Sequence, residues 1–412
     1  MTELPSGWSH ESINSIVEGG MIADGDWVES KDQDSNGEVR LTQLADVGDG
    51  EFRSRSDRWM NDEQASRLNV NYLRPGDLLM ARMPDPLGRT CMVPENIGRA
   101  VTVVDVAIIR ITRKDVNPKF VMWLLNSPGI RQQIEMLASG TTRRRITRKN
   151  LGTINLPMPS FEEQNKIVEL LEDHLSRLDA ALADVKQAKI RAAQFRNVYI
   201  DNFLERAKGV KTTLGSVSKF NSGFAYKSSV WQDYGIPVVK IMNVKHRVVN
   251  LEGCSYITPE IAESSKSFAV KKGDLLFNMT GATLGAFGFY NLEKEARMNQ
   301  RVGKFVPINV NELNLNYLAY FLEAASTQRT IQELAKGAAQ PNISPTDILS
   351  LDINLPDFGM QNAIVDELNS ALSKVSQVDQ LCNITQVESK ALRRSLLQAA
   401  FTGQLAKEVA SV

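Results

Sequence analysis

The apolar residues of one long stretch, from Ser160 to Lys208, recur at helical spacing, and the stretch contains no proline or glycine. Its apolar positions form two heptad series, the first being Leu171, Leu178, Val185, Ala192 and Tyr199, and the second Ile167, His174, Ala181, Ala188 and Phe195. Alternating steps of three and four residues between two such series are typical of a coiled-coil seam, in which His174 would set the register. Because a lone apolar seam is unstable in water, the helix needs a partner, and the pattern also fits a long spacer or a dimer zipper.

The stretch that begins at Gly359 carries the same spacing and is a candidate partner within the chain. Its seam positions are Ile364, Leu368, Ala371, Val375, Val378 and Cys382, and after a looser part the pattern returns at Leu392, Leu396 and Ala399. Two such helices in one chain predict an intramolecular coiled coil.

Matching motifs also recur at one fixed distance. The sequence Gly-Asp-Leu-Leu begins at Gly76 and at Gly273, and the pair Gln-Asn begins at Gln164 and at Gln361, so both lie 197 positions apart (273 − 76 and 361 − 164). Several motifs in the same order at one spacing indicate an internal duplication. The chain is therefore predicted to contain two copies of one unit, each a globular region followed by a long helix.

This duplication divides the chain into four segments. Residues 1–158 and 209–357 are expected to form two similar mixed α/β domains, and residues 159–208 and 358–412 two long helices. A chain of 412 residues is too long for a single hydrophobic core, which agrees with this division. The predicted fold class is mixed α/β with an internal repeat.

Alternating or β-branched runs predict strands in both domains. They lie at residues 39–44, 78–82 and 101–111 in the first domain, the last as one central strand, and at residues 236–244 in the second, where residues 269–279 carry the Gly-Asp turn and its strand. Helices are expected to begin at Pro118 and Leu315.

Charge and cysteine content narrow the class of protein. The 48 basic and 48 acidic residues cancel, whereas a free-standing DNA-binding domain is usually basic. The chain therefore either does not bind nucleic acid, or carries local positive charge that partners supplement. Three scattered cysteines, the absence of a visible signal peptide and the absence of a long apolar run predict a cytoplasmic protein with no membrane partner.

No catalytic motif is complete in this sequence. The glycines at 281, 285 and 288 lack the Lys-Ser/Thr of a phosphate-binding loop. Neither the histidines, His10, His174 and His246, nor the cysteines have the spacing of a metal site. We therefore expect no catalytic residue, no metal and no cofactor on this chain.

Positive charge gathers in one segment, which we call the basic segment. It contains Arg143, Arg144, Arg145, Arg148 and Lys149, with Thr141, Thr142 and Thr147 as additional donors. Cations and short donors beside a glycine suit the binding of DNA phosphates, although a solvated loop fits the pattern equally well. The second copy has no such cluster.

A further set of polar residues surrounds the repeated Gly-Asp turn and the strands near it. Its members are Arg82 and Arg89 in the first copy, and Lys245, Arg247, Asn278 and Thr280 in the second. Arginine and asparagine are side chains that read guanine and adenine in the major groove. Two domains with one frame and different polar residues are therefore predicted to read different DNA sequences.

Taken together, these motifs resemble the specificity subunits of type I restriction–modification systems. The resemblance covers nearly the whole chain and rests on GDLLMAR and GDLLFNM, on SGTTRRRITRKNLGTINLPMP and KGAAQPNISPTDILSLDINLP, and on EEQNKIVELLE and LRRSLLQAAFTGQLA. The missing basic segment in the second copy is a departure that leaves its DNA-facing residues open.

The resemblance implies a particular division of labour. Each globular region would be a target recognition domain for one half of a bipartite, asymmetric double-stranded DNA site, and the two long helices would lie antiparallel and set the distance between the domains. The specificity subunit would have no activity of its own. Two methyltransferase subunits that modify adenine N6, together with restriction subunits, would be its partners, and S-adenosylmethionine, ATP and Mg would be bound by those partners.

Two other classes of function stay open at this point. One is a coiled-coil assembly protein that never contacts DNA, and the other is a single-chain nuclease or methyltransferase. A gel-shift with and without a methyltransferase partner distinguishes the first alternative from a DNA-specificity subunit. An activity assay on the purified chain distinguishes the second alternative from it.

Overall fold

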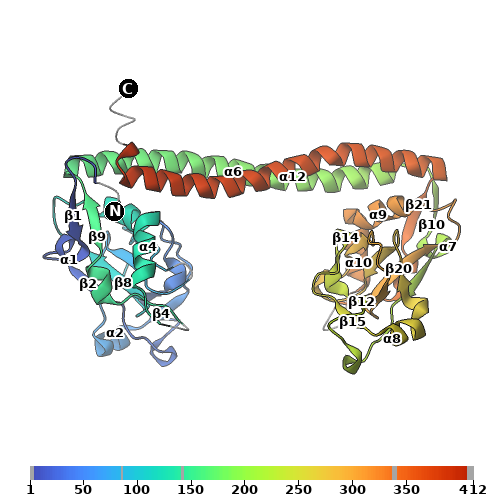
Figure 1. The fold of residues 1–412 in the computed structure, drawn as a ribbon, viewed down its shortest axis with the longest axis horizontal. Helices are drawn as coiled ribbons and strands as arrows, with labels where there is room; N and C mark the ends of the chain where they lie inside the picture. The colour runs from blue at the N-terminus through green and yellow to red at the C-terminus, as the bar shows by residue number, and fades with distance from the viewer. Residues whose placement is uncertain (1–3, 85–86, 141–142, 336–340, 406–412) are drawn as a thin grey trace. The chain divides into compact units, whose positions relative to one another are not determined.

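The computed structural model describes residues 4–84, 87–140, 143–335 and 341–405, which form two compact units. Unit 1 is drawn from residues 1–185 and 384–412, and unit 2 from residues 186–383. Each unit holds one mixed α/β domain, part of the long helix that follows it and part of the other long helix (Figure 1). None of the helices in the described ranges is long and apolar enough to cross a membrane.

Unit 1 contains three small sheets, with strand orders β2-β8-β5-β6, β4-β3-β7 and β1-β9. The strands are β1 (Ser9–Ser12), β2 (Met21–Asp24), β3 (Val39–Thr42), β4 (Arg58–Met60), β5 (Leu78–Ala81), β6 (Thr90–Met92), β7 (Ala100–Thr102), β8 (Val106–Arg110) and β9 (Asn155–Met158). The shorter helices are α1 (Ile13–Ile16), α2 (Asp62–Leu68), α3 (Pro118–Leu125), α4 (Pro128–Leu137) and α5 (Arg148–Gly152).

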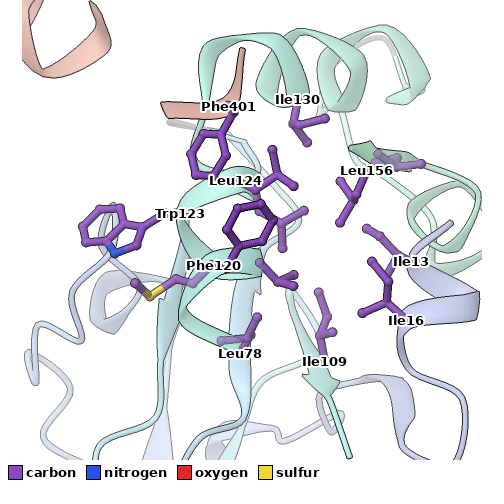
Figure 2. Packing of buried hydrophobic residues seen from close by; sticks show 14 of the residues in the cluster. Ile13, Ile16, Leu78, Ile109, Phe120, Trp123, Leu124, Ile130, Leu156 and Phe401 are labelled. Carbon is purple, nitrogen blue, oxygen red and sulfur yellow. The ribbon is translucent and has the colours of Figure 1, made fainter. Parts of the chain in front are cut away.

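The core of unit 1 is built around α3. Asn117 caps this helix through its side chain, and Pro118 occupies the first turn, where a missing N–H costs nothing. Phe120 is fully buried, and its ring meets that of Phe401 edge to face at 5.3 Å between centroids (Figure 2). Because Phe401 is the last residue of α12 (Phe358–Phe401), the C-terminal long helix is part of the core of the N-terminal domain.

Unit 2 repeats this plan with a larger sheet, of order β11-β20-β17-β18-β14-β13, beside β15-β12-β19-β16 and β10-β21. The strands are β10 (Val210–Thr213), β11 (Ser218–Ser222), β12 (Ile236–Val239), β13 (Val244–Lys245), β14 (Arg247–Val249), β15 (Ser255–Ile257), β16 (Ala269–Val270), β17 (Leu275–Asn278), β18 (Phe287–Phe289), β19 (Ala296–Met298), β20 (Val302–Pro307) and β21 (Asp352–Leu355). The shorter helices are α7 (Leu214–Val217), α8 (Pro259–Ser264), α9 (Leu315–Glu323), α10 (Ala325–Leu334) and α11 (Pro345–Leu349).

One tight turn occurs at the same place in both domains. In unit 1 the N–H of Val106 donates to the carbonyl of Val103 (2.9 Å), which closes a turn between β7 and β8. In unit 2 the N–H of Val302 donates to the carbonyl of Asn299 (2.9 Å) between β19 and β20. We call these segments the unit 1 turn (Val103–Val106) and the unit 2 turn (Asn299–Val302).

The unit 1 turn shows that the prediction of a single strand at residues 101–111 is wrong. The β-branched run contains no glycine or proline to mark a turn, so its pattern resembles an unbroken buried strand. The glycine that the turn requires is instead on a neighbouring segment. A Cβ added to Gly25 would lie 2.2 Å from the carbonyl oxygen of Val103.

The repeated Gln-Asn pair ties each long helix to the domain that precedes it. In unit 1 the side chain of Gln164 accepts from the N–H of Asn117 (2.8 Å), and Asn117 Nδ2 donates to Asn165 Oδ1 (2.7 Å). In unit 2 the side chain of Gln361 accepts from the N–H of Asn314 (2.9 Å). The repeat therefore preserves the junction between domain and helix.

The two long helices, α6 (Phe161–Arg206) and α12, run antiparallel within each unit. In unit 1 the beginning of α6 and the end of α12 share one core cluster, which includes Leu171 and Leu397. In unit 2 the end of α6 and the beginning of α12 share another, which includes Leu204 and Leu368. The fold class is thus mixed α/β, with two similar domains and two long antiparallel helices.

On α6, most of the second heptad series of the predicted seam is shifted by one position toward the C-terminus. Leu171 is buried and Leu178 and Val185 are half-buried, but the prediction that His174 and Phe195 lie in the seam is wrong, because both are exposed, Phe195 by 52%. Ile167 is buried as predicted, and the other buried or half-buried positions beside the first series are Val168, Leu175, Leu182, Lys189, Arg196 and Phe203. The predicted second series and the observed one both lie three or four residues from the first series. The observed series is the buried one because it carries the larger apolar side chains in the first half of the helix.

The corresponding face of α12 is closer to the predicted one. Ile364 and Leu368 are buried, and Val375 and Leu396 are half-buried. Val378 and Leu392, which were also expected in the seam, are 39% and 50% exposed.

Candidate nucleic-acid interface

Several strand ends of unit 1 meet at one edge of its domain, which we call the turn edge. β3 and β7 pair in parallel and end there together, at Thr42 and Thr102. The unit 1 turn then leads into β8 at Val106, which pairs with Ala81 at the end of β5. Residues that follow β3 and β5 are therefore brought close to the residues of the turn.

Arg82 follows β5 directly, and it is buried. Its guanidinium pairs with Asp24, and its Nε donates to the carbonyl of Ile146 (3.0 Å), so that its side chain is only 5% exposed. Burial, partly opposed by Asp24, lowers the pKa of Arg82 below its ordinary value. Arg82 thus holds the basic segment in place through Ile146, and its contact with DNA stays a prediction.

Two arginines of the basic segment are bonded to the domain. Arg145 donates to the carbonyl of Val104 in the unit 1 turn (2.7 Å) and lies 3.9 Å from Asp105. Arg144 donates to the carbonyl of Glu135 at the end of α4. These bonds fix the path of the segment across the turn edge.

The remaining cations of the basic segment are exposed. They are Arg143, Arg148 and Lys149, and the last two begin α5 after its cap, Thr147. Arg148 and Lys149 line an open recess of about 550 Å³ that Arg82 also borders. Thr141 and Thr142 lie outside the described residues.

Arg89 joins a second group of arginines at the turn edge of unit 1. Its guanidinium donates to the carbonyl of Leu44 (2.8 Å), and burial followed by the nearby charge of Arg53 lowers its pKa. The loop that carries Arg53 and Arg55 is held by the buried carboxylate of Asp46, which accepts from the N–H of Arg55 (2.6 Å). Sequence reasoning missed this loop, which the alternation of arginine and serine at residues 53–56 could have indicated.

The turn edge of unit 2 is built in the same way. β12 and β19 pair in parallel and end at Val239 and Met298. The unit 2 turn leads into β20 at Val302, which pairs with Asn278 at the end of β17. Polar residues from β12, β17 and the turn therefore meet here.

The predicted readers Asn278 and Thr280 are both buried at this edge. Asn278 Nδ2 donates to the carbonyl of Ile241 (2.9 Å) and to Thr283 Oγ1 (3.0 Å). Thr280 Oγ1 donates to the carbonyl of Pro341 (3.1 Å). Both side chains hold loops together, and their contact with DNA stays a prediction.

Lys245 and Arg247, which were predicted to contact DNA, have different surroundings. Lys245 is exposed. Arg247 has a left-handed backbone with φ of 58°, lies over the ring of Tyr320 at 4.1 Å, and donates to Glu323 (2.6 Å). Arg247 therefore stabilises the fold beside α6, because Glu323 also pairs with Arg196 of that helix.

Glu323 is the buried acceptor of this ion cluster, with a side chain that is 5% exposed. Burial alone would raise its pKa, but hydrogen bonds from His246, Arg196 and Arg247 outweigh it and lower the pKa from 4.5 to about 2. Its ionised form therefore stabilises unit 2.

Replacing Glu323 by glutamine is expected to destabilise unit 2 by about 3 kcal/mol at neutral pH, since a pKa shift from 4.5 to about 2 corresponds to that free energy. Because the folded pKa is the lower one, this stability is complete well above pH 4.5 and is lost as pH falls toward about 2. Hydrogen exchange of unit 2 amides across pH measures it, and wild type and variant should converge in acid. Glu293→Gln, at an exposed pair with Lys272, is the matched control and should change little. Equal protection of wild type and Glu323→Gln at pH 7 would contradict this role.

Sequence reasoning also missed two exposed residues on the unit 2 turn, Gln300 and Arg301. The signal was present as a polar Asn-Gln-Arg triplet between two apolar runs. Among the residues with described positions, no group of three or more His, Cys, Asp or Glu side chains is placed to hold a metal ion.

The sequence matches a known protein family over most of its length. The model of the type I restriction modification DNA specificity domain matches residues 89–191 and 208–384. The chain belongs to this family. Each of its two domains carries one matched region, as expected from the internal repeat.

Two individual relatives show how far the similarity extends. The MjaVIII specificity subunit of Methanocaldococcus jannaschii is 21% identical over 286 residues, which cover 65% of this chain and 65% of the relative. The EcoKI specificity subunit of Escherichia coli is 22% identical over 304 residues, covering 69% of this chain and 65% of the relative. The matches thus span slightly less than two-thirds of these relatives.

Solved structures are similar over almost the full chain. A chain from a structure concerning complex assembly and conformational transition of the type I R-M system matches with a TM-score of 0.79 at 18% identity, covering 98% of this chain and 100% of that one. The HsdS subunit from Thermoanaerobacter tengcongensis matches with a TM-score of 0.58 at 19% identity, covering 98% of both chains. At these identities the likeness shows the fold.

Proposed function

We propose that this chain is the DNA-specificity subunit of a type I restriction–modification complex, in which each unit reads one half of a bipartite, asymmetric double-stranded DNA site. The observation that carries the proposal is the contrast between the two turn edges. They share strand register and turn geometry, yet one bears the basic segment and the other bears Gln300 and Arg301. A common frame with different polar residues is what reading two different sequences requires.

The charge distribution supports contact with the DNA backbone in unit 1. Arg143, Arg148 and Lys149 are exposed at the turn edge, while Arg82 and Arg145 hold their segment to the domain. Because the backbone of the segment is already held, these cations can neutralise phosphates without ordering of the loop on binding. The chain as a whole is neutral, so partner subunits would supply the remaining positive surface.

The proposed division of labour places the chemistry outside this chain. Methyltransferase subunits would bind S-adenosylmethionine and modify adenine N6, and restriction subunits would use ATP and Mg. The present chain would act in the cytoplasm, without catalytic activity, by choosing the DNA site.

The proposal is tested by a gel-shift with randomised duplex DNA, using the chain with and without its methyltransferase partner. We expect the complex to select two short fixed sequences separated by a gap of fixed length. Selection of no sequence, or of a single continuous one, would refute it. A methyltransferase or nuclease assay on the purified chain alone should give no product.

Replacing Arg143, Arg148 and Lys149 together by alanine should weaken binding of every DNA sequence to a similar degree. The plot of log affinity against log salt concentration should become less steep by about 0.9 for each phosphate that the variant no longer neutralises. Binding titrations from low to high salt provide the measurement. Lys166→Ala, at an exposed helix-surface ion pair, is the control. An unchanged slope would leave the basic segment as a solvated loop.

A further inference from the structure

The unit 2 turn is a rigid projection at the turn edge. The N–H of Gln300 donates to the carbonyl of Phe224 (2.9 Å), and the N–H of Asn299 donates to the carbonyl of Val239 (3.0 Å). Gly223 permits this close approach, because an added Cβ would lie 2.3 Å from the carbonyl oxygen of Asn299. The backbone of the turn is therefore bonded on both sides, while the side chains of Gln300 and Arg301 are exposed.

The side chains of Gln300 and Arg301 differ from those of the arginines that are bonded within the two domains. Arg82, Arg145 and Arg247 each donate to acceptors within their own unit. Gln300 and Arg301 are exposed, and their side chains make no hydrogen bond or ion pair within the described part of the chain. Their donors and acceptors are available to a ligand.

A recess beside the turn gives these side chains a defined setting. It has a volume of about 280 Å³ and is lined by Trp231, Lys240, Ile241, Asn299, Gln300 and Arg301. Lys240 Nζ lies 4.1 Å from the centroid of the Trp231 ring and donates to Ser255 Oγ (2.6 Å). The cation and the indole are thus held in place next to the turn.

The equivalent turn of unit 1 has the same backbone and different side chains. Val104 and Asp105 occupy the places of Gln300 and Arg301, because the carbonyls of Asp105 and Arg301 accept from the N–H groups of Arg82 and Met279, respectively. In unit 1 the neighbouring Arg145 is bonded to the turn. The two domains therefore differ in chemistry at a position where their frames coincide.

We propose that Gln300 and Arg301 of the unit 2 turn read base edges in the major groove of DNA, with Lys240 and Trp231 shaping the recess beside them. This inference rests on the proposed function and deepens it by assigning base-reading residues to the second domain. The guanidinium of Arg301 suits O6 and N7 of guanine, and the amide of Gln300 suits N6 and N7 of adenine. The half-site of unit 2 is thus expected to contain a guanine and an adenine close together.

The test measures binding of the purified complex of this chain and its methyltransferase to duplexes in which each base pair of the selected motif is changed in turn. Arg301→Ala and Gln300→Ala should each lose roughly 10- to 100-fold of discrimination at one base pair, and both base pairs should belong to the same half-site. Arg301→Lys should retain affinity but lose part of the discrimination, because lysine keeps the charge and lacks the two-pronged guanidinium. This variant also preserves the exposed charge if the alanine variant folds poorly.

Arg329→Ala, at an exposed arginine of α10 in the same unit, is the matched control and should leave all discrimination intact. Uniform loss of affinity in Arg301→Ala, with a salt slope reduced by about one, would identify a phosphate contact and overturn the inference. Unchanged discrimination in both alanine variants would also overturn it. Failure of the wild-type complex to select any motif would refute the proposed function itself.

Discussion

Replacing Leu175 by aspartate is expected to destabilise unit 1 by about 3–5 kcal/mol, because an uncompensated carboxylate would then be buried in the core. Leu175 is only 3% exposed, and it shares a core cluster with Leu397 and Phe401 of α12 as well as Phe120 of the domain. Loss of this residue should therefore release α12 from both α6 and the domain. Denaturant unfolding monitored by hydrogen exchange in unit 1 measures the loss of stability. Leu175→Ala, which removes apolar contacts without adding a charge, should lower the free energy of unfolding by about 2–4 kcal/mol.

The matched control is the adjacent residue. His174→Asp introduces the same carboxylate one position earlier on the same helix, where the side chain is exposed, and should change stability by less than about 0.5 kcal/mol. If His174→Asp were the more damaging substitution, the seam would have the register expected from the sequence and not that of the structure.

This pair of variants also marks where sequence reasoning reaches its limit on the fold. The internal repeat and the two long helices follow from motif spacing and heptad periodicity, and the mixed α/β class follows from the strand and helix patterns of the two domains. The face of α6 beyond Ile167 does not, because His174 and Phe195 satisfy the same three–four spacing as Leu175 and Arg196. The sizes of the side chains at 174 and 175 favour the second series, but only packing against α12 and the domain decides between the two.

The sequence predicts which polar residues gather at the candidate site, but not which of them are buried. The sequence indicates that Arg82, Asn278 and Thr280 gather near strand ends, and they do lie at the turn edges. Their burial could not be foreseen, because it depends on partners distant in sequence, such as Ile146 for Arg82 and Pro341 for Thr280. Gln300 and Arg301 were missed although the polar triplet at residues 299–301 marks the turn, because a short polar triplet does not show that the turn lies at the same edge as the end of β17.

The structure also shows what a domain exchange must preserve. The core of unit 1 contains residues from the domain, from α6 and from α12, so a cut at residue 158 passes between partners that pack together. Asn117 bonds to Gln164 and Asn165 across this cut, and Phe120 packs on Phe401. A donor domain therefore needs asparagine and phenylalanine at these two positions if the helices are to keep their places.

Replacing residues 1–158 by the corresponding domain of a relative that meets this condition should change one half of the recognised DNA sequence completely. The other half, and the length of the gap, should stay as they are, because unit 2 and both long helices are retained. The proposed function makes this the largest expected change in specificity, since all polar residues at one turn edge are exchanged at once. Sequencing of methylated adenines in a host that expresses the chimera with its methyltransferase gives both half-sites and the gap. A chimera whose donor lacks asparagine at position 117 serves as the control and should lose stability, because Asn165 loses its partner and α3 loses its side-chain cap. If the matched exchange alters both halves of the site, the two units do not read DNA independently, and the modular account is refuted.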